Sequence, residues 1–143
     1  MHAHDWQAGL APTYLQYGPA HDVRTVLTVH NIAFQDLAPA AMLVAMGLPL
    51  AAYTSGDLEY WGQISTLKAG LVTSDAITTV SPTYAAELMR PEFGMGLEGV
   101  IASRASDLTG VLNGIDTNVW NPEIDLEIAP YSAKSLKSQS SGG

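Results

Sequence analysis

The sequence predicts an α/β fold built around a parallel sheet, and three segments carry that prediction. Residues 23–31, VRTVLTVHN, are β-branched and almost continuously apolar, as in a strand covered on both faces. Ile77 and Val80 suit a second short buried strand, and residues 108–116, LTGVLNGID, contain another apolar run. Segments of helical periodicity separate these candidates, and strands that alternate with helices are typical of a parallel sheet.

The helical segments carry recognisable starts. Residues 5–17 predict a helix with Asp5 as its N-cap, because apolar side chains recur at positions 6, 10 and 14. Residues 61–75 place further apolar side chains at helical spacing. Ser81 followed by Pro82 predicts the N-cap and first position of another helix.

Composition and helix-breaking residues indicate the structure of three further segments. Residues 37–53 are apolar throughout, but Pro39, Gly47 and Pro49 divide them, so a buried or flap helix fits better than a membrane span. Asn113 and Gly114 favour a turn, and residues 131–143, rich in Ser, Gly and Lys, predict a disordered tail.

The overall composition excludes several classes of partner. With 6 basic and 14 acidic residues the formal net charge is -8, so we expect no nucleic-acid partner and no anionic membrane partner. The chain has no cysteine, which excludes disulfides and thiolate metal sites and is compatible with a cytoplasmic protein. A hydrophobic content of 47% is enough for a buried core of about one domain.

Candidate site residues follow the predicted strands, because ligands of open α/β sheets bind outside the carboxyl ends of the strands. His4, Asp5, His30 and Asn31 hold such positions. Imidazole and carboxylate groups bind hydroxyls well, so a polyhydroxylated ligand is favoured. The alternatives are a helix cap for Asp5 and a loop role for His4. His30 is the strongest single candidate because it directly follows a buried strand.

A metal site is the main rival interpretation. His2-Ala3-His4 has the H-x-H pattern that binds zinc at the end of a barrel strand in metal-dependent hydrolases. Such sites recruit further histidines, and only His21 and His30 remain in the chain. A metal-dependent hydrolase therefore ranks below a sugar-binding site, and no metal ligand is assigned.

Five segments, taken in order, resemble the bacterial glycogen synthase and plant starch synthase family: HAHDWQAGLAP, TVHNIAFQ, GQISTLKAGLVTSDAITTVSPTYAAEL, GMGLEGV and GVLNGIDTNVWNP. The resemblance implies a glycosyltransferase of the GT-B fold, with its active site between two Rossmann-like domains. The chain is similar to the second half of the first domain. We therefore expect an incomplete Rossmann-like parallel sheet with flanking helices over residues 1–130, with the strand that normally precedes the first motif missing, and a tail over 131–143.

The family reaction, as the resemblance implies it, transfers glucose from ADP-glucose to the non-reducing end of an α-1,4-glucan, with retention and without metal or cofactor. His30 matches the family histidine that contacts the donor glucose, and Asp5 matches the aspartate of the first motif. These two are the expected catalytic residues. The expected substrate-binding residues, which shape the cleft, are Asn31, Gln35, Trp6 and His4.

Departures from the family pattern qualify this expectation. The K-x-G-G-L loop that faces the donor diphosphate and the C-terminal domain have no counterpart, so we expect the chain alone to be inactive. A non-catalytic glucan-binding or sugar-binding module is the alternative. We also expect the isolated chain to be partly molten, self-associated or dependent on a complementary partner, because the missing strands uncover the side chains of Val26, Leu27, Val29, Ile77 and Val80.

Overall fold

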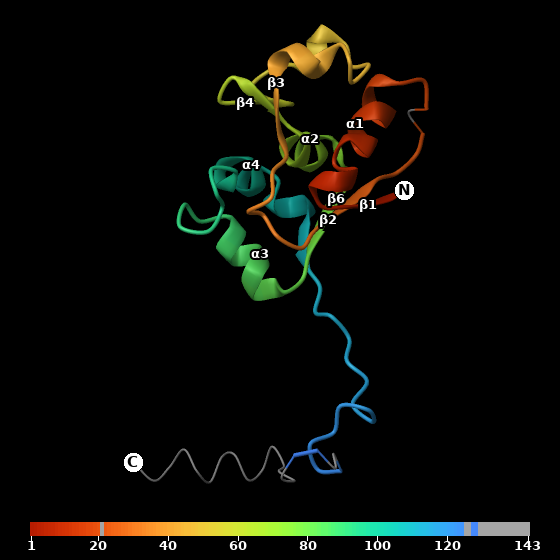
Figure 1. Ribbon diagram of the computed structural model, residues 1–143, viewed down its shortest axis with the longest axis vertical. Coiled ribbons are helices and arrows are strands. Elements are labelled where there is room, and N and C mark those ends of the chain that lie inside the picture. Colours follow the sequence, from red (N-terminus) through yellow and green to blue (C-terminus); the bar gives the residue numbers. More distant parts are fainter. Residues whose placement is uncertain (21, 125–126, 129–143) are drawn as a thin grey trace. The chain divides into compact units, whose positions relative to one another are not determined.

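The computed structural model describes residues 1–20, 22–124 and 127–128 of the 143-residue chain (Figure 1). By internal contacts the chain divides into two compact units, Met1–Leu112 and Asn113–Gly143. The predicted tail over residues 131–143 lies outside the described residues. In the second unit, Asp116 rather than Asn113 and Gly114 organises a turn, because its Oδ1 accepts hydrogen bonds from the backbone N–H groups of Asn118 and Val119.

The first unit contains a four-stranded parallel sheet, as the sequence predicts. Its strands lie in the order β1-β2-β6-β7 and comprise β1 (His2–His4), β2 (Val26–Val29), β6 (Ala76–Thr79) and β7 (Leu108–Gly110). The expectation that no strand leads into the first motif is wrong, because β1 pairs in parallel with β2 over its three residues. Val80 follows β6 instead of belonging to it.

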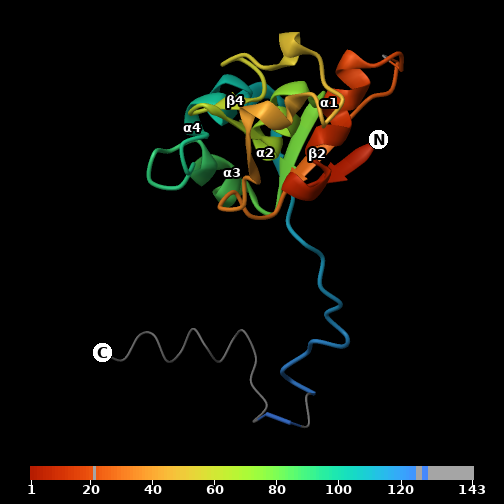
Figure 2. The ribbon, with the colours of Figure 1, turned by 45° about the horizontal axis from the view of Figure 1, so that its top comes forward.

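The helices pack against one face of this sheet. They are the 3-10 helix η1 (Trp6–Ala8), α1 (Leu10–Tyr17), α2 (Thr66–Thr73), α3 (Pro82–Leu88), α4 (Glu98–Ser103) and the 3-10 helix η4 (Ala105–Asp107). Figure 2 shows α2 between α1 and α4. Leu67 and Leu71 of α2 share one core cluster with Leu27, Val29 and Ile77 of the strands. The predicted cap of α3 is confirmed, since the Ser81 hydroxyl accepts from the Tyr84 N–H.

The two faces of the sheet are covered unequally. Leu27, Val29 and Ile77 point to the helical face and are at most 1% exposed, so the expectation that they lose their cover is wrong. Their neighbours Val26 and Thr78 point to the opposite face and remain partly exposed. Partly exposed side chains therefore occur only at alternate positions along these strands, because the helices of the described chain cover only one face of the sheet.

A second, smaller sheet lies beyond α2. It is antiparallel, with the strand order β3-β5-β4, and comprises β3 (Leu37–Pro39), β4 (Glu59–Tyr60) and β5 (Gln63–Ser65). The helix predicted over 61–75 is therefore correct only from Thr66, because residues 63–65 pair as a strand.

The apolar segment 37–53 does not form the predicted α-helix. After β3 it contains two 3-10 helices, Ala40–Leu43 and Leu50–Ala52, as its prolines and Gly47 interrupt any longer helix. Leu43 and Ala52 are buried in a second core cluster, while Val44 is 84% exposed. Among the described residues, no helix is long and apolar enough to span a membrane.

Candidate sugar-binding site at the carboxyl ends of the strands

The parallel register brings two histidines together where β1 and β2 end. His4 pairs with Thr28 in the sheet, and His30 follows β2 directly. His4 Nδ1 and His30 Nε2 are 3.0 Å apart and share a hydrogen bond, and the two rings stack with their centroids 5.3 Å apart. Both side chains are exposed, so this imidazole pair is accessible to a ligand.

Asp5 fixes the backbone beneath the imidazole pair. Its Oδ1 accepts hydrogen bonds from the N–H groups of His30, at 2.7 Å, and Asn31, at 3.3 Å, while its own N–H donates to Thr28. The side chain makes no capping bond to η1, so the predicted N-cap role is wrong. Asp5 has φ 51° and ψ -165°, a strained backbone conformation that is almost confined to glycine. The carboxylate thus clamps the end of β2 to the end of β1.

The hydrogen bonds continue from this clamp along the sheet face. His2 Nε2 and Thr28 Oγ1 are 2.6 Å apart, and Thr28 Oγ1 lies 2.6 Å from Thr78 Oγ1 on β6. His2 and His4 are thereby committed to different partners, Thr28 and His30. Within the described chain, no group of three or more His, Cys, Asp or Glu side chains is arranged to hold a metal ion, so the geometry gives the hydrolase interpretation no support.

The remaining predicted residues have mainly structural contacts. Asn31 Oδ1 accepts from the Ala33 N–H and forms a local turn. Trp6 packs against the core cluster, and its carbonyl accepts from the Thr66 hydroxyl. Gln35 Nε2 donates to the carbonyl of Met95 at 2.8 Å. These contacts tie Asn31, Trp6 and Gln35 to the protein itself, and their role toward a substrate stays a prediction.

The loop around Met95 and Gly96 contacts the predicted site residue Gln35, and this loop was not identified from the sequence as part of the site. Met95 and Gly96 have positive φ values of 53° and 84°, and the Met95 carbonyl accepts hydrogen bonds from both Gln35 and the Tyr60 hydroxyl. A Cβ on Gly96 would lie 2.3 Å from that hydroxyl oxygen, so only glycine fits there. The segment GMGLEG was the available signal, since closely spaced glycines mark strained backbone.

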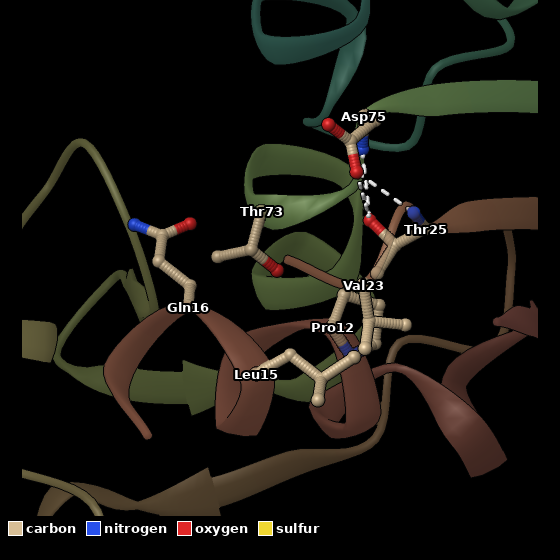
Figure 3. A pocket seen from close by; sticks show the side chains of 7 residues that line it. All are labelled: Pro12, Leu15, Gln16, Val23, Thr25, Thr73 and Asp75. Carbon is tan, nitrogen blue, oxygen red and sulfur yellow. Dashed lines mark hydrogen bonds between the residues drawn. The ribbon is translucent and has the colours of Figure 1, made fainter. Parts of the chain in front are cut away.

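A separate pocket lies at the opposite, amino-terminal ends of β2 and β6. Figure 3 shows Pro12, Leu15 and Gln16 of α1 on one side of it, with Thr25 and Asp75 on the other. The Asp75 carboxylate accepts from the N–H and hydroxyl of Thr25, at 2.7 and 3.0 Å. These contacts tie the start of β2 to the start of β6.

The Asp75 contacts predict a pH dependence of stability. Hydrogen bonds from the Thr25 backbone and from Arg24 lower the pKa of Asp75 to about 2. Since this pKa is below that of an unfolded aspartate, about 3.9, the carboxylate stabilises the fold fully above pH 4 and loses that effect as the pH falls toward 2. In urea titrations between pH 5 and 2, Asp75→Asn should show a smaller loss of stability than the wild type. Equal pH dependence in both proteins would contradict the assignment.

Comparison with known proteins decides the family. The model of the starch synthase catalytic domain matches residues 1–103, which is more than half of the chain. The chain belongs to the starch synthase catalytic domain family. The resemblance inferred from the five motifs is thereby confirmed.

Named relatives of this starch synthase domain are bacterial. It is 63% identical over 139 residues to a glycogen synthase of Cereibacter sphaeroides strain ATCC 17025, a match that covers 97% of this chain and 29% of the relative. It is 62% identical over 122 residues to the glycogen synthase of Paracoccus denitrificans, covering 85% of this chain and 26% of that protein. The chain thus spans less than a third of the length of these relatives.

The solved structures include a starch synthase with the same fold. The catalytic domain of starch synthase IV from Arabidopsis thaliana, bound to ADP and acarbose, superposes with a TM-score of 0.75 at 30% identity. The match covers 96% of this chain and 32% of that one. This likeness confirms the expected α/β fold as part of a GT-B starch synthase domain.

Proposed function

We propose that His4, Asp5 and His30 form the sugar-binding half of a site that transfers glucose from ADP-glucose to the non-reducing end of an α-1,4-glucan, with retention at the anomeric carbon. The observation that carries the proposal is the Asp5 clamp, which holds the backbone of His30 while leaving the imidazole exposed. The glycogen synthase names of the relatives and the ADP and acarbose bound to the starch synthase IV domain support this substrate class.

The geometry indicates a separate role for each of the three side chains. Asp5 uses Oδ1 for the backbone of β2, which leaves Oδ2 to accept from a sugar hydroxyl. His30 meets the glucose ring, where its imidazole and its main-chain carbonyl orient the sugar and favour positive charge at the anomeric carbon. His4 is a positioning residue, because its hydrogen bond and ring stacking fix the plane of the His30 imidazole.

For the chain by itself we propose sugar binding without turnover. Transfer from a nucleotide sugar needs positive charge beside the leaving diphosphate. The four basic side chains of the described residues have their contacts outside the strand-end site: Arg24 and Arg90 pair with carboxylates at the surface, and Lys68 and Arg104 donate to backbone carbonyls. We infer a cytoplasmic location, because sugar nucleotides are intracellular donors.

A chimera tests the transfer function. Residues 1–112 of this chain replace the matching segment of the Cereibacter glycogen synthase, and incorporation of labelled glucose from ADP-glucose into glycogen is measured. The chimera should be active, and His30→Ala should lower kcat by about 100-fold or more. Val44→Ala is the matched control, because Val44 is 84% exposed and belongs to the apolar segment 37–53 outside the strand-end site. A His30→Ala chimera that keeps the parent rate would refute the proposal.

We also propose that the chain self-associates through the less covered face of its sheet. Parallel sheets are normally covered on both faces, and Val26 and Thr78 are only partly covered here. Sedimentation velocity should detect concentration-dependent dimers or larger species, which Thr109→Asp on the same face should weaken. A monodisperse monomer at all concentrations would contradict this proposal.

A further inference from the structure

The hairpin that joins β4 to β5 carries a tryptophan where a small polar residue is expected. Tyr60 pairs with Gln63, so Trp61 and Gly62 form a two-residue turn, with φ values of 51° and 80°. Positive φ at both positions is the pattern of a type I′ turn, in which Asn-Gly is strongly preferred. A bulky side chain is unfavourable there, and such outliers concentrate at ligand-binding sites.

The indole of Trp61 points away from the core. Trp61 is 84% exposed, and the Tyr60 ring meets it edge-on, with centroids 6.5 Å apart at 83°. An exposed tryptophan supplies a large rigid contact surface, because ordering it on a ligand costs little conformational entropy. Trp61 therefore presents a face on which a flat apolar surface can stack.

Three hydrogen bonds hold the hairpin in place. Glu59 Oε1 accepts from the Gly62 N–H at 2.7 Å, which closes the turn. The Lys68 amine donates to the carbonyl of Glu59, and the Tyr60 hydroxyl donates to the carbonyl of Met95. The hairpin is thus fixed to α2 by Lys68 and to the loop around Met95 by Tyr60.

An open pocket of about 280 Å³ lies beside the indole. Glu59, Tyr60 and Trp61 line it from the hairpin, and Gly96 and Val100 line it from the loop and α4. The lining is mainly aromatic and aliphatic, and Glu59 and Lys68 add one acidic and one basic residue to it. This combination suits a ring that has apolar C–H faces and hydroxyls at its edge.

We propose that Trp61 is the platform of a second carbohydrate subsite, which binds one pyranose ring of an α-glucan by stacking. A neutral ligand fits a chain of net charge -8 better than an anionic one. The choice of an α-glucan rests on the proposed function. Gln35 and Tyr60 both donate to the Met95 carbonyl, which links the subsite to the segment that follows His30, and a glucan that reaches both places gains effective concentration.

Maltoheptaose titrations of the full chain test this subsite. We expect the Trp61 indole N–H signal in ¹⁵N-labelled protein to shift with ligand, and Trp61→Asn to weaken calorimetric binding at least tenfold. Trp61→Asn also restores the Asn-Gly turn, so its melting temperature should equal or exceed that of the wild type. Trp120→Asn is the matched control, because Trp120 is 70% exposed but lies in the second unit.

The outcomes separate this subsite from the proposed function. Binding by Trp61→Asn that equals the wild type, or an equal loss in Trp120→Asn, would overturn the subsite. So would a Trp61 signal that responds to ADP and not to maltoheptaose. If the His30 ring signals move and the Trp61 signal does not, the subsite is overturned while the proposed function stands. If Trp61 responds and the His30→Ala chimera stays active, the subsite stands and the proposed function fails.

Discussion

Gly9→Ala should lower the free energy of unfolding by about 3 kcal/mol, the upper end of the usual cost of overpacking. Gly9 joins η1 to α1 at the point where the chain crosses the start of α2. A Cβ at this position would lie 2.2 Å from the carbonyl oxygen of Thr66 and 2.8 Å from its carbon. Both are backbone atoms, so a side-chain rotation cannot relieve the clash. Urea unfolding followed by circular dichroism measures the effect.

The same contact includes a second glycine and has a clear control. A Cβ on Gly70 would lie 2.9 Å from the Gly9 carbonyl oxygen. The start of α1 and the helix α2 can therefore pack this closely only because both residues at the contact are glycine. Gly99→Ala in α4 is the matched control, since a Cβ there meets nothing within 4 Å. It should leave stability unchanged or raise it by up to about 1 kcal/mol. If Gly9→Ala unfolds at the urea concentration of the wild type, the close approach of the helices is wrong.

Asp5→Ala should remove the clamp and lower the free energy of unfolding by about 2 kcal/mol, as expected for lost hydrogen bonds to a charged group. The N–H groups of His30 and Asn31 lose their acceptor, and the strained backbone at residue 5 loses the side-chain hydrogen bonds that hold it. Amide hydrogen exchange at His30 and Asn31 should accelerate locally, beyond the global loss of stability.

Asp5→Asn separates the structural role of this residue from its charge. Asparagine keeps an acceptor oxygen for the two backbone N–H groups, so exchange at His30 should stay slow. In the chimera, both Asp5→Ala and Asp5→Asn should lower glucose transfer if the carboxylate binds a sugar hydroxyl. Unchanged exchange in Asp5→Ala would show that the clamp does not hold the end of β2.

The strands and one helix start were predictable from local sequence. β2 and β6 are apolar and β-branched, and Ser81-Pro82 supplies a cap and a helical first position that need no tertiary context. β1 was missed because three residues show too little alternation, and only pairing with β2 makes them a strand. The N-cap prediction for Asp5 is wrong because an aspartate before a helix has the same sequence signal whether it bonds the helix or a distant strand.

The hairpin was missed for a related reason. Residues 61–75 have apolar spacing compatible with a helix, and Trp61-Gly62 lacks the Asn-Gly signal of a tight hairpin turn. The position of His30 at the end of a strand is predictable from the apolar run before it, whereas its role in the site stays a prediction. Gln35 contacts the Met95 carbonyl, and Trp6 packs against the core cluster. In both cases the partners are distant in the sequence. Such long-range contacts have no local signature.

We expect the imidazole of His30, which Asp5 and His4 hold in place, to contact the glucose that is transferred. The most direct measurement is a crystal structure of the chimera soaked with ADP-glucose. We expect the glucose ring at the carboxyl ends of β1 and β2, with a sugar oxygen within about 2.6–3.2 Å of His30. A glucose ring bound out of reach of His30, for example in the pocket between Gln16 and Asp75, would contradict the account.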